Sequence, residues 1–456
     1  MSSFGADAGA LADREVASRS PGEVRIVHLV RAALALLVIA NLGRIPVFST
    51  GQRDVPILVN DLVVGATIAA GILAMVAHRT LVVDRVMGFA LVFAGVGALS
   101  AVLSIPRFGL SSFDVAVSLA YLARWLFYFA IYVVVVNTVR ARDAEAVWRA
   151  LETAVLLFAA FGVFQSAFLP DFAQTVYPDS RRYLDWDPQG HRLVSTFLDP
   201  NFAGAFIAIG LLVSLSRLAA GASVASWKLI LLTLAMLLTA SRSSILAFLV
   251  GGFTILAIRG MSRQLLRAIG VGVLLLALAA PKLIAFARAY NKFQIDASAL
   301  QRLSSWSHGL QVLGDHPVIG IGFNTWGFVQ ERYGWPRLFA ATYGLDGGLL
   351  FIAVLTGFVG LALYLLMLWS VCTRARRVWR DPRNPEGHRG LAIGAVAVIP
   401  AIIVHSIFIN SLLFPFVMET LWVLWALVVC VDRARAAEPL PRTRVPVRLV
   451  ALADAT

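Results

Sequence analysis

The chain has 456 residues, of which 59% are hydrophobic and 14% are charged, and its mean hydropathy is +0.79. Soluble domains carry about 25% charged residues, so this composition excludes an ordinary soluble protein and indicates one surrounded mostly by lipid. The net charge of +13 does not indicate nucleic-acid binding, because the arginines are spread through the segments between apolar runs.

Apolar runs recur along the whole chain. A helix needs about 20 apolar residues to cross a bilayer, and these runs are continuous rather than alternating, which excludes a membrane β-barrel. The predicted fold class is therefore an all-α polytopic membrane protein with about twelve transmembrane helices. The predicted spans are 27–43, 55–77, 86–105, 113–136, 147–169, 201–216, 226–240, 243–258, 265–286, 346–371, 389–408 and 411–432.

The spans divide the chain into five parts. Residues 1–26 form a polar cytoplasmic tail without the apolar stretch of a signal peptide. The first nine helices occupy 27–286, a large periplasmic loop follows at 287–345, and the last three helices occupy 346–432. Residues 433–456 form a second cytoplasmic tail.

The distribution of positive charge predicts the orientation. With a cytoplasmic N-terminus, the inner segments hold 24 of the 39 Lys and Arg residues, as the positive-inside rule requires. The strongest anchor is the arginine run between Arg374 and Arg383, which we expect to contact lipid headgroups. Cys372 and Cys430 fall at inner span ends, so no disulfide is expected.

The first candidate site residues lie in 191–204, HRLVSTFLDPNFAG. This segment places Arg192, Asp199 and Asn201 at the outer mouth of a span. Pro200 fits the first turn of a helix and Asp199 its N-cap. The segment is then either a well-capped helix or a helix start that offers free N–H groups to an anion.

The next candidate is Arg242 in the sequence TASRSS (239–244), which forms the shortest outer connection. A cation near membrane depth is costly and is usually paired. Either the side chain reaches outer headgroups, or it turns inward and grips a phosphate with its planar guanidinium.

The large outer loop contains a helical pattern. Leucines and Trp306 recur at spacings of three and four residues over 300–313, which predicts an amphipathic helix at the outer interface or over a cavity. Arg302 and His308 lie on it, and His316 precedes Pro317. The GIGFN sequence at 320–324 predicts a tight turn.

Asp346 lies where the loop re-enters the membrane. It is either a helix cap or a general base in a partly dry site. Ionisable residues within membrane spans are functional candidates unless they pair with one another. Those here are Asp61, Arg124, Glu152 and His405.

Arg192, Arg242 and Arg302 are all predicted to lie on the outer face, which indicates an anionic ligand such as a phosphate. No Walker or dinucleotide motif is present, and no spacing of His, Cys or acidic residues indicates a metal site. We therefore predict no cofactor and no metal.

Four motifs in this order resemble the bacterial O-antigen ligase and polymerase superfamily. They are STFLDPN (195–201), TASRSS (239–244), Arg302 to Trp326 with HPVIGIGFNTW, and GLDGGLLFIAVLTGFVGL (344–361). The resemblance covers roughly 190–365, while the first five spans match only in being apolar.

The resemblance implies a GT-C-like glycosyltransferase of the bacterial inner membrane with its active site facing the periplasm. The implied partners are a donor glycan on undecaprenyl diphosphate, an acceptor glycan or lipid A-core, and membrane lipids. Arg242 and Arg302 would bind the diphosphate with help from Arg192. Asp346 is predicted as the base from its location alone, not from the resemblance, and Arg302 is the second predicted catalytic residue. Further candidates for substrate contact are Asp199, Asn201, Trp306, His308, Asn324, Arg337 and Tyr343.

One departure from the family pattern bears on the reaction. Ligases carry a His-Asn pair where the loop re-enters, and this chain has Leu345 and Asp346 there. This favours a polymerase of exopolysaccharide or O-antigen over an O-antigen ligase. A lipid-linked oligosaccharide flippase or solute transporter would place its charges near the midplane instead, and a scaffold subunit without catalysis is a third alternative.

Overall fold

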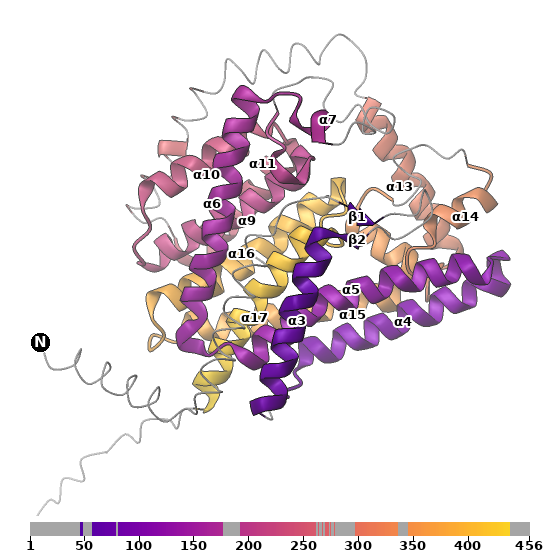
Figure 1. The fold of residues 1–456 in the computed structure, drawn as a ribbon, viewed down its shortest axis with the longest axis horizontal. Coiled ribbons are helices and arrows are strands. Elements are labelled where there is room, and N and C mark those ends of the chain that lie inside the picture. The colour runs from indigo at the N-terminus through magenta and orange to yellow at the C-terminus, as the bar shows by residue number, and fades with distance from the viewer. Residues whose placement is uncertain are drawn as a thin grey trace, which may run out of the picture.

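The computed structural model describes residues 46–48, 57–78, 81–176, 192–260, 297–335 and 345–437, with isolated positions between 263 and 278. These residues are almost entirely helical, as predicted (Figure 1). The predicted tail at 1–26, the span at 27–43 and most of the span at 265–286 lie outside the described residues, as does the tail after residue 437.

Four long helices occupy the first part. They are α3 (Val59–His78), α4 (Arg85–Phe108), α5 (Ser112–Thr138) and α6 (Ala144–Phe168). The 3-10 turn η1 (Ala141–Asp143) precedes α6, and the short α7 (Phe172–Val176) follows it. Before α3, strand β1 (Pro46–Phe48) pairs antiparallel with β2 (Ile57–Leu58), a small addition to the predicted all-helical fold.

The second part begins with the 3-10 turn η2 (Ser195–Phe197), followed by α9 (Pro200–Ala220), α10 (Ser226–Leu238) and α11 (Arg242–Arg259). Between α11 and the last three helices lie α13 (Ala297–Asp315) and α14 (Trp326–Arg332). The last three are α15 (Gly348–Arg380), α16 (Glu386–Phe408) and α17 (Pro415–Ala437). α15 and α17 extend beyond the predicted ends at 371 and 432.

Nine helices in the described part of the chain are long and apolar enough to cross a membrane, and α10 is a shorter apolar helix. The chain is thus a multi-pass membrane protein. The total of twelve spans stays a prediction, because two of them fall mainly outside the described residues.

Helix ends are set by local sequence signals. Ser111 and Asp114 form a capping box at the start of α5, and Asp84 caps α4, each side chain accepting from an otherwise unpaired backbone N–H group. Gly109 ends α4 in the left-handed conformation that a side chain would disfavour.

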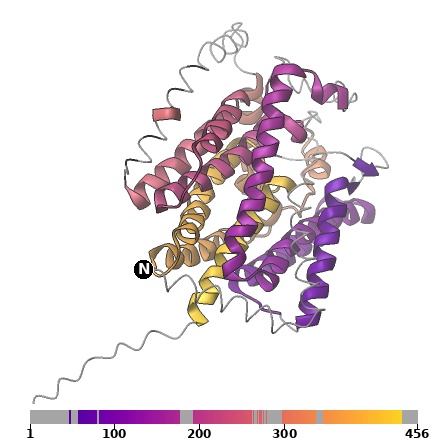
Figure 2. The ribbon, with the colours of Figure 1, turned by 60° about the vertical axis from the view of Figure 1, so that its left-hand side comes forward.

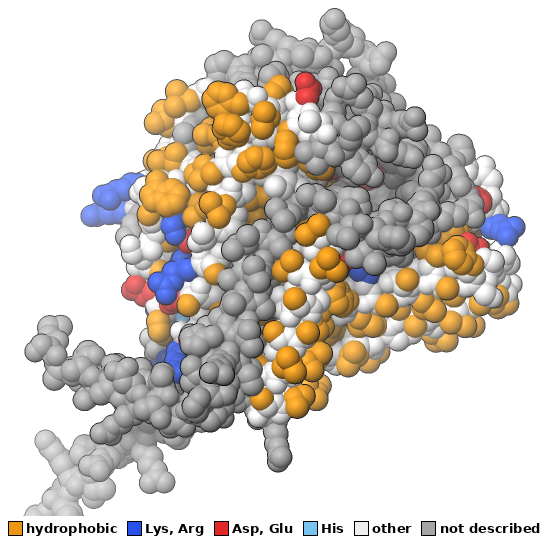
Figure 3. Space-filling view, in the orientation of Figure 1, with side chains coloured by type: hydrophobic (Ala, Val, Ile, Leu, Met, Phe, Trp, Pro, Cys, Tyr) orange, Lys and Arg blue, Asp and Glu red, His pale blue; other side chains and the backbone are white. Residues whose placement is uncertain are grey.

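The core of the bundle lies around α9 and α17, which are buried along almost their whole length. α16 packs between α9, α11 and α15 (Figures 1 and 2). By contrast, α3 leaves Leu62, Leu73 and Val76 exposed, and Figure 3 shows hydrophobic side chains over this helix and along α4 and α5. These faces suit contact with lipid.

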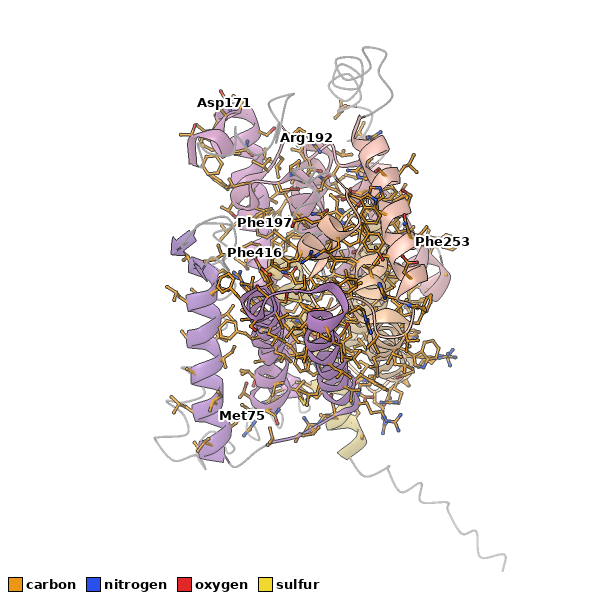
Figure 4. The ribbon with its side chains drawn as sticks, turned by 90° about the vertical axis from the view of Figure 1, so that its right-hand side faces the viewer. Met75, Asp171, Arg192, Phe197, Phe253 and Phe416 are labelled. Carbon is orange, nitrogen blue, oxygen red and sulfur yellow. The ribbon has the colours of Figure 1, made fainter. Side chains whose placement is uncertain are left out.

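The bundle has two ends. In Figure 4, Asp171 and Arg192 lie at one end and Met75 lies towards the other. We call the end with Arg192, α13 and the N-termini of α9 and α11 the predicted outer end.

Two of the ionisable groups within the spans form ion pairs. Arg124 contacts Asp61 at 2.6 Å, and Lys228 contacts Glu152 at 2.5 Å with Ser214 bonded to the same carboxylate. Pairing removes most of the cost of burying these charges.

Two arginines of the predicted lipid-headgroup anchor also connect helices of the bundle. Arg374 and Arg377 both bind Asp432 of α17, so these two arginines join α15 to α17 in addition to any headgroup contact.

α15 is broken at Gly357, whose φ of 66° and ψ of −174° interrupt the helix. Residues 317–323, which we call the strap, fill the break. The strap N–H groups of Ile321 and Gly322 donate to the carbonyls of Val354 and Leu355, at 3.0 and 2.9 Å. Returning bonds run from the N–H groups of Phe358 and Val359 to strap carbonyls at 2.7 and 3.2 Å.

The strap therefore satisfies backbone groups that would otherwise be buried without partners, the condition under which irregular backbone is tolerated at membrane depth. Arg107 of α4 also donates to Gly320 O at 2.9 Å. The predicted tight turn at 320–324 is present, with Thr325 N bonded to Gly322 O, and it anchors the large loop between α4 and α15.

Candidate functional site

The start of α9 is built as the sequence predicts. Asp199 accepts from the N–H groups of Asn201 and Phe202 at 2.8 and 3.1 Å, and Pro200 occupies the first turn. Just before it, Ser195 and Leu198 have φ of 49° and 53°, a sharp turn held by Gln165 and by a bond from Ser195 Oγ to Phe158 O. The Asp199 carboxylate is thus engaged as a cap.

Two of the predicted arginines lie at the turn between α10 and α11. Arg242 is the first residue of α11 and its side chain is exposed. The Arg192 Nε donates to the carbonyl of Thr239 at 2.9 Å. Arg192 and Arg242, 50 residues apart in the sequence, therefore lie at one short turn, and Figure 4 shows Arg192 at the predicted outer end.

Asn201 joins the start of α9 to the same turn. Its Oδ1 accepts from Ser241 Oγ at 2.9 Å, and its carbonyl accepts from Ser244 Oγ at 3.2 Å. Ser241 is also the N-cap of α11. The helices approach closely enough here that a Cβ on Gly204 would lie 2.3 Å from Ser244 Oγ, so two helix N-termini, each with positive dipole character, are locked together.

His405, at the end of α16, lies beneath this junction. It is fully buried, and its Nε2 lies 3.2 Å from Ser243 Oγ and 3.1 Å from Ser244 Oγ. Its Nδ1 lies 2.6 Å from Ser411 Oγ in the connection to α17. Three helices and the connection to α17 therefore meet through one group of buried hydroxyl, amide and imidazole groups.

The third predicted arginine lies on α13, close to Asp346. Ser305 of this helix accepts from the backbone N–H of Asp346 at 3.0 Å. Trp306 lies against Gly347, where an added Cβ would sit 3.4 Å from the indole nitrogen. α13 thus covers the start of α15.

The pKa of Asp346 is raised above its ordinary value by burial, an effect that the nearby Arg302 guanidinium partly offsets. Arg302 is also within electrostatic range of the His405 imidazole. Gly347 and Gly348, which follow Asp346, lie against Ile407 and Ser406 of α16, so Asp346 lies at the same end of α16 as His405.

Other predicted residues of the large loop have their contacts elsewhere in the loop. His308 stacks on Trp335 at 4.0 Å between ring centroids, and Tyr333 stacks on the same indole at 4.7 Å. Asn324 adopts a φ of 55° after the strap. Arg337 and Tyr343 lie outside the described residues.

The predicted amphipathic helix is present as α13, but its apolar side chains divide between two faces. Trp306 and Leu313 turn toward the protein, while Leu303 and Leu310 are exposed. The remaining loop histidine, His316, has a pKa lowered by burial and by the neighbouring Arg107 charge.

The serines of the candidate site were not predicted from the sequence. Ser241, Ser243 and Ser244 flank Arg242 in the TASRSS motif, and Ser305 and Ser411 come from two other segments. The serines around Arg242 were detectable only as a local enrichment, because their partners Asn201 and His405 lie 40 and about 160 residues away.

The assembled site is rich in positive charge and hydrogen-bond donors. Within the described residues, no group of three or more His, Cys, Asp or Glu side chains is placed to hold a metal ion. Guanidinium groups and helix N-termini are the features that bind phosphate oxygens, and a partly buried carboxylate beside them is suited to proton transfer.

Comparison with known families gives one match. Residues 227–365 match the family model described as O-antigen ligase. The match confirms the resemblance to the O-antigen ligase and polymerase superfamily, over a segment that contains Arg242, Arg302 and Asp346. No curated protein matched the chain in a separate search.

Proposed function

We propose that this membrane protein, whose central segment resembles the O-antigen ligases, transfers a glycan from undecaprenyl diphosphate to an acceptor sugar hydroxyl on the periplasmic face of the bacterial inner membrane. The observation that supports the proposal is that buried His405 lies against the first turn of α11, which follows Arg242, and directly precedes the α16 residues that contact the glycines after Asp346. Arginine side chains suit the diphosphate of a lipid-linked donor, and a carboxylate suits the proton of a sugar hydroxyl.

The arginines would bind the diphosphate of the donor. Arg242 is exposed at the start of α11, and the bond from Arg192 to Thr239 brings a second guanidinium to the same turn. Fixed cations favour departure of the diphosphate, because negative charge develops on its oxygens as the glycosidic bond breaks. No metal is needed for this neutralisation.

Asp346 would act as the general base. The acceptor oxygen forms a bond to the anomeric carbon while the bond from that carbon to the diphosphate oxygen breaks, and the acceptor proton passes to the carboxylate. The raised pKa of Asp346 supports this role, since a base works best when its pKa approaches the working pH. The products are a longer glycan and free undecaprenyl diphosphate.

Polymerisation of exopolysaccharide or O-antigen is the favoured form of the reaction, since the His-Asn pair of the ligases is replaced by Leu345 and Asp346. Purified protein should be incubated with defined lipid-linked repeat units, with and without lipid A-core. Extension of the repeat unit alone would support a polymerase, whereas transfer to lipid A-core would support a ligase.

The arginines provide the decisive test. Arg242→Ala and Arg302→Ala should each abolish product while the protein remains in the membrane. Arg332→Ala is the matched control, because Arg332 is an exposed arginine at the end of α14 that donates to Gly109 O. Normal product from both site variants would refute the proposal.

The transporter alternative receives less support. It predicts charges that line a path near the midplane, but Asp61 and Glu152 are paired with Arg124 and Lys228. Internal pairing explains these charges without a transported substrate.

A further inference from the structure

His405 is the centre of a buried polar group on which the candidate site rests. The residue has no exposed surface, and both ring nitrogens lie within hydrogen-bond distance of hydroxyl groups. Burying a polar ring beneath a membrane helix junction is costly unless its hydrogen bonds are made. The arrangement therefore constrains each of its neighbours to one position.

The neighbours on the Nε2 side belong to the segment that begins with Arg242. On one side of the ring, Ser243 and Ser244 form the first turn of α11, directly after Arg242. Ser241 extends the connection to Asn201. On the other side, Ser411 fixes the connection between α16 and α17.

The segment that bears Asp346 also rests on this end of α16. A Cβ added to Gly348 would lie 3.0 Å from Ser406 Cβ, and one added to Gly347 would lie 3.3 Å from the Ile407 carbonyl. His405 precedes these two residues directly. One short stretch of α16 thus supports the arginine-bearing turn and the carboxylate-bearing turn together.

We propose that His405 is a positioning residue, which sets the distance between Arg242 and the Arg302–Asp346 pair by holding the first turn of α11 through Ser243 and Ser244. This inference rests on the proposed function. His405 does not touch substrate, because it is fully buried; it acts through Arg242.

Two substitutions of His405 distinguish the contacts of its Nε2 atom from those of its Nδ1 atom. Glutamine places its amide nitrogen near the position of Nε2 and preserves the contact with the serines, whereas asparagine reaches only the position of Nδ1 near Ser411. His405→Asn should weaken equilibrium binding of undecaprenyl diphosphate by about 10- to 100-fold, the effect of a small displacement in a positioned site. His405→Gln should bind nearly as tightly as the wild type.

A double-mutant cycle then tests whether the effect passes through Arg242. If it does, Arg242→Ala combined with His405→Asn should bind no more weakly than Arg242→Ala alone. Equal losses from Asn and Gln, or independent losses in the cycle, would overturn the positioning role. If His405→Asn does not fold, Ser243→Ala with Ser244→Ala removes the contacts to Nε2 together with the bonds to Ser241 and Asn201, and unchanged binding by that variant would overturn the positioning role.

The two proposals fail differently. If Arg242→Ala alone leaves undecaprenyl diphosphate binding unchanged, the proposed function is wrong. If Arg242→Ala abolishes binding but His405→Asn leaves it intact in a folded protein, only the positioning role is wrong.

Discussion

Gly357 offers a direct test of the strap that anchors the outer loop. Replacing it with alanine places a Cβ about 2.0 Å from the Val318 carbonyl oxygen and 2.4 Å from the Ile319 nitrogen. Real Cβ atoms do not approach backbone so closely, and the strap cannot shift without losing the four hydrogen bonds that join it to α15.

The expected cost combines three effects. A non-glycine residue in the left-handed region costs about 1–2 kcal/mol, and the clash adds about 1–3 kcal/mol of overpacking. Each hydrogen bond lost adds about 1 kcal/mol. We therefore expect Gly357→Ala to destabilise the protein by about 3–6 kcal/mol, measured by thermal or denaturant unfolding of the purified protein in detergent.

Gly252→Ala is the matched control. Gly252 lies within α11 with no heavy atom within 4 Å of an added Cβ, so alanine should be neutral or stabilise the helix by up to about 1 kcal/mol. Equal unfolding midpoints for the two variants would refute the reasoning. Gly357→Ala should also reduce glycan transfer, because the strap directly follows α13, which carries Arg302.

Three further predictions address the site and the bundle. Burial raises the pKa of Asp346, and the base is active only when deprotonated, so transfer should fall on acidification at a pH above the ordinary carboxyl range of about 4. A pH profile without this acid limb would contradict the role. Asp346→Asn should abolish transfer while leaving undecaprenyl diphosphate binding intact. Glu152→Gln leaves Lys228 without its buried partner and should destabilise the protein by about 3 kcal/mol in an unfolding experiment; an unchanged midpoint would show that the pair contributes nothing. Transfer should be unaffected by EDTA, and restoration of lost activity by Mg²⁺ would contradict charge neutralisation by Arg242 and Arg302.

Much of the helical framework could be predicted from local sequence. The apolar runs located the described spans to within a few residues, except where α15 and α17 continue into charged sequence. The N-cap at Asp199 and the helix start at Pro200 were correct, since capping depends on neighbouring residues in the chain.

The candidate site was predictable only in part. Arg192, Arg242, Arg302 and Asp346 were identified by their position at the ends of apolar runs, but their mutual arrangement was not. His405 was one of several intramembrane candidates, and nothing in its local sequence connects it to serines 161 and 162 residues away.

By itself, the sequence determined that this is a helical membrane protein, where its helices begin, and which family its central segment resembles. These properties depend on transfer of side chains into lipid and on hydrogen bonds between residues close in the chain. Only the tertiary structure decided that the strap fills the break in α15, that Asp61 pairs with Arg124 and Glu152 with Lys228, and that His405 joins the starts of α9 and α11. Such contacts link residues far apart in the chain, so they exist only once the helices have packed.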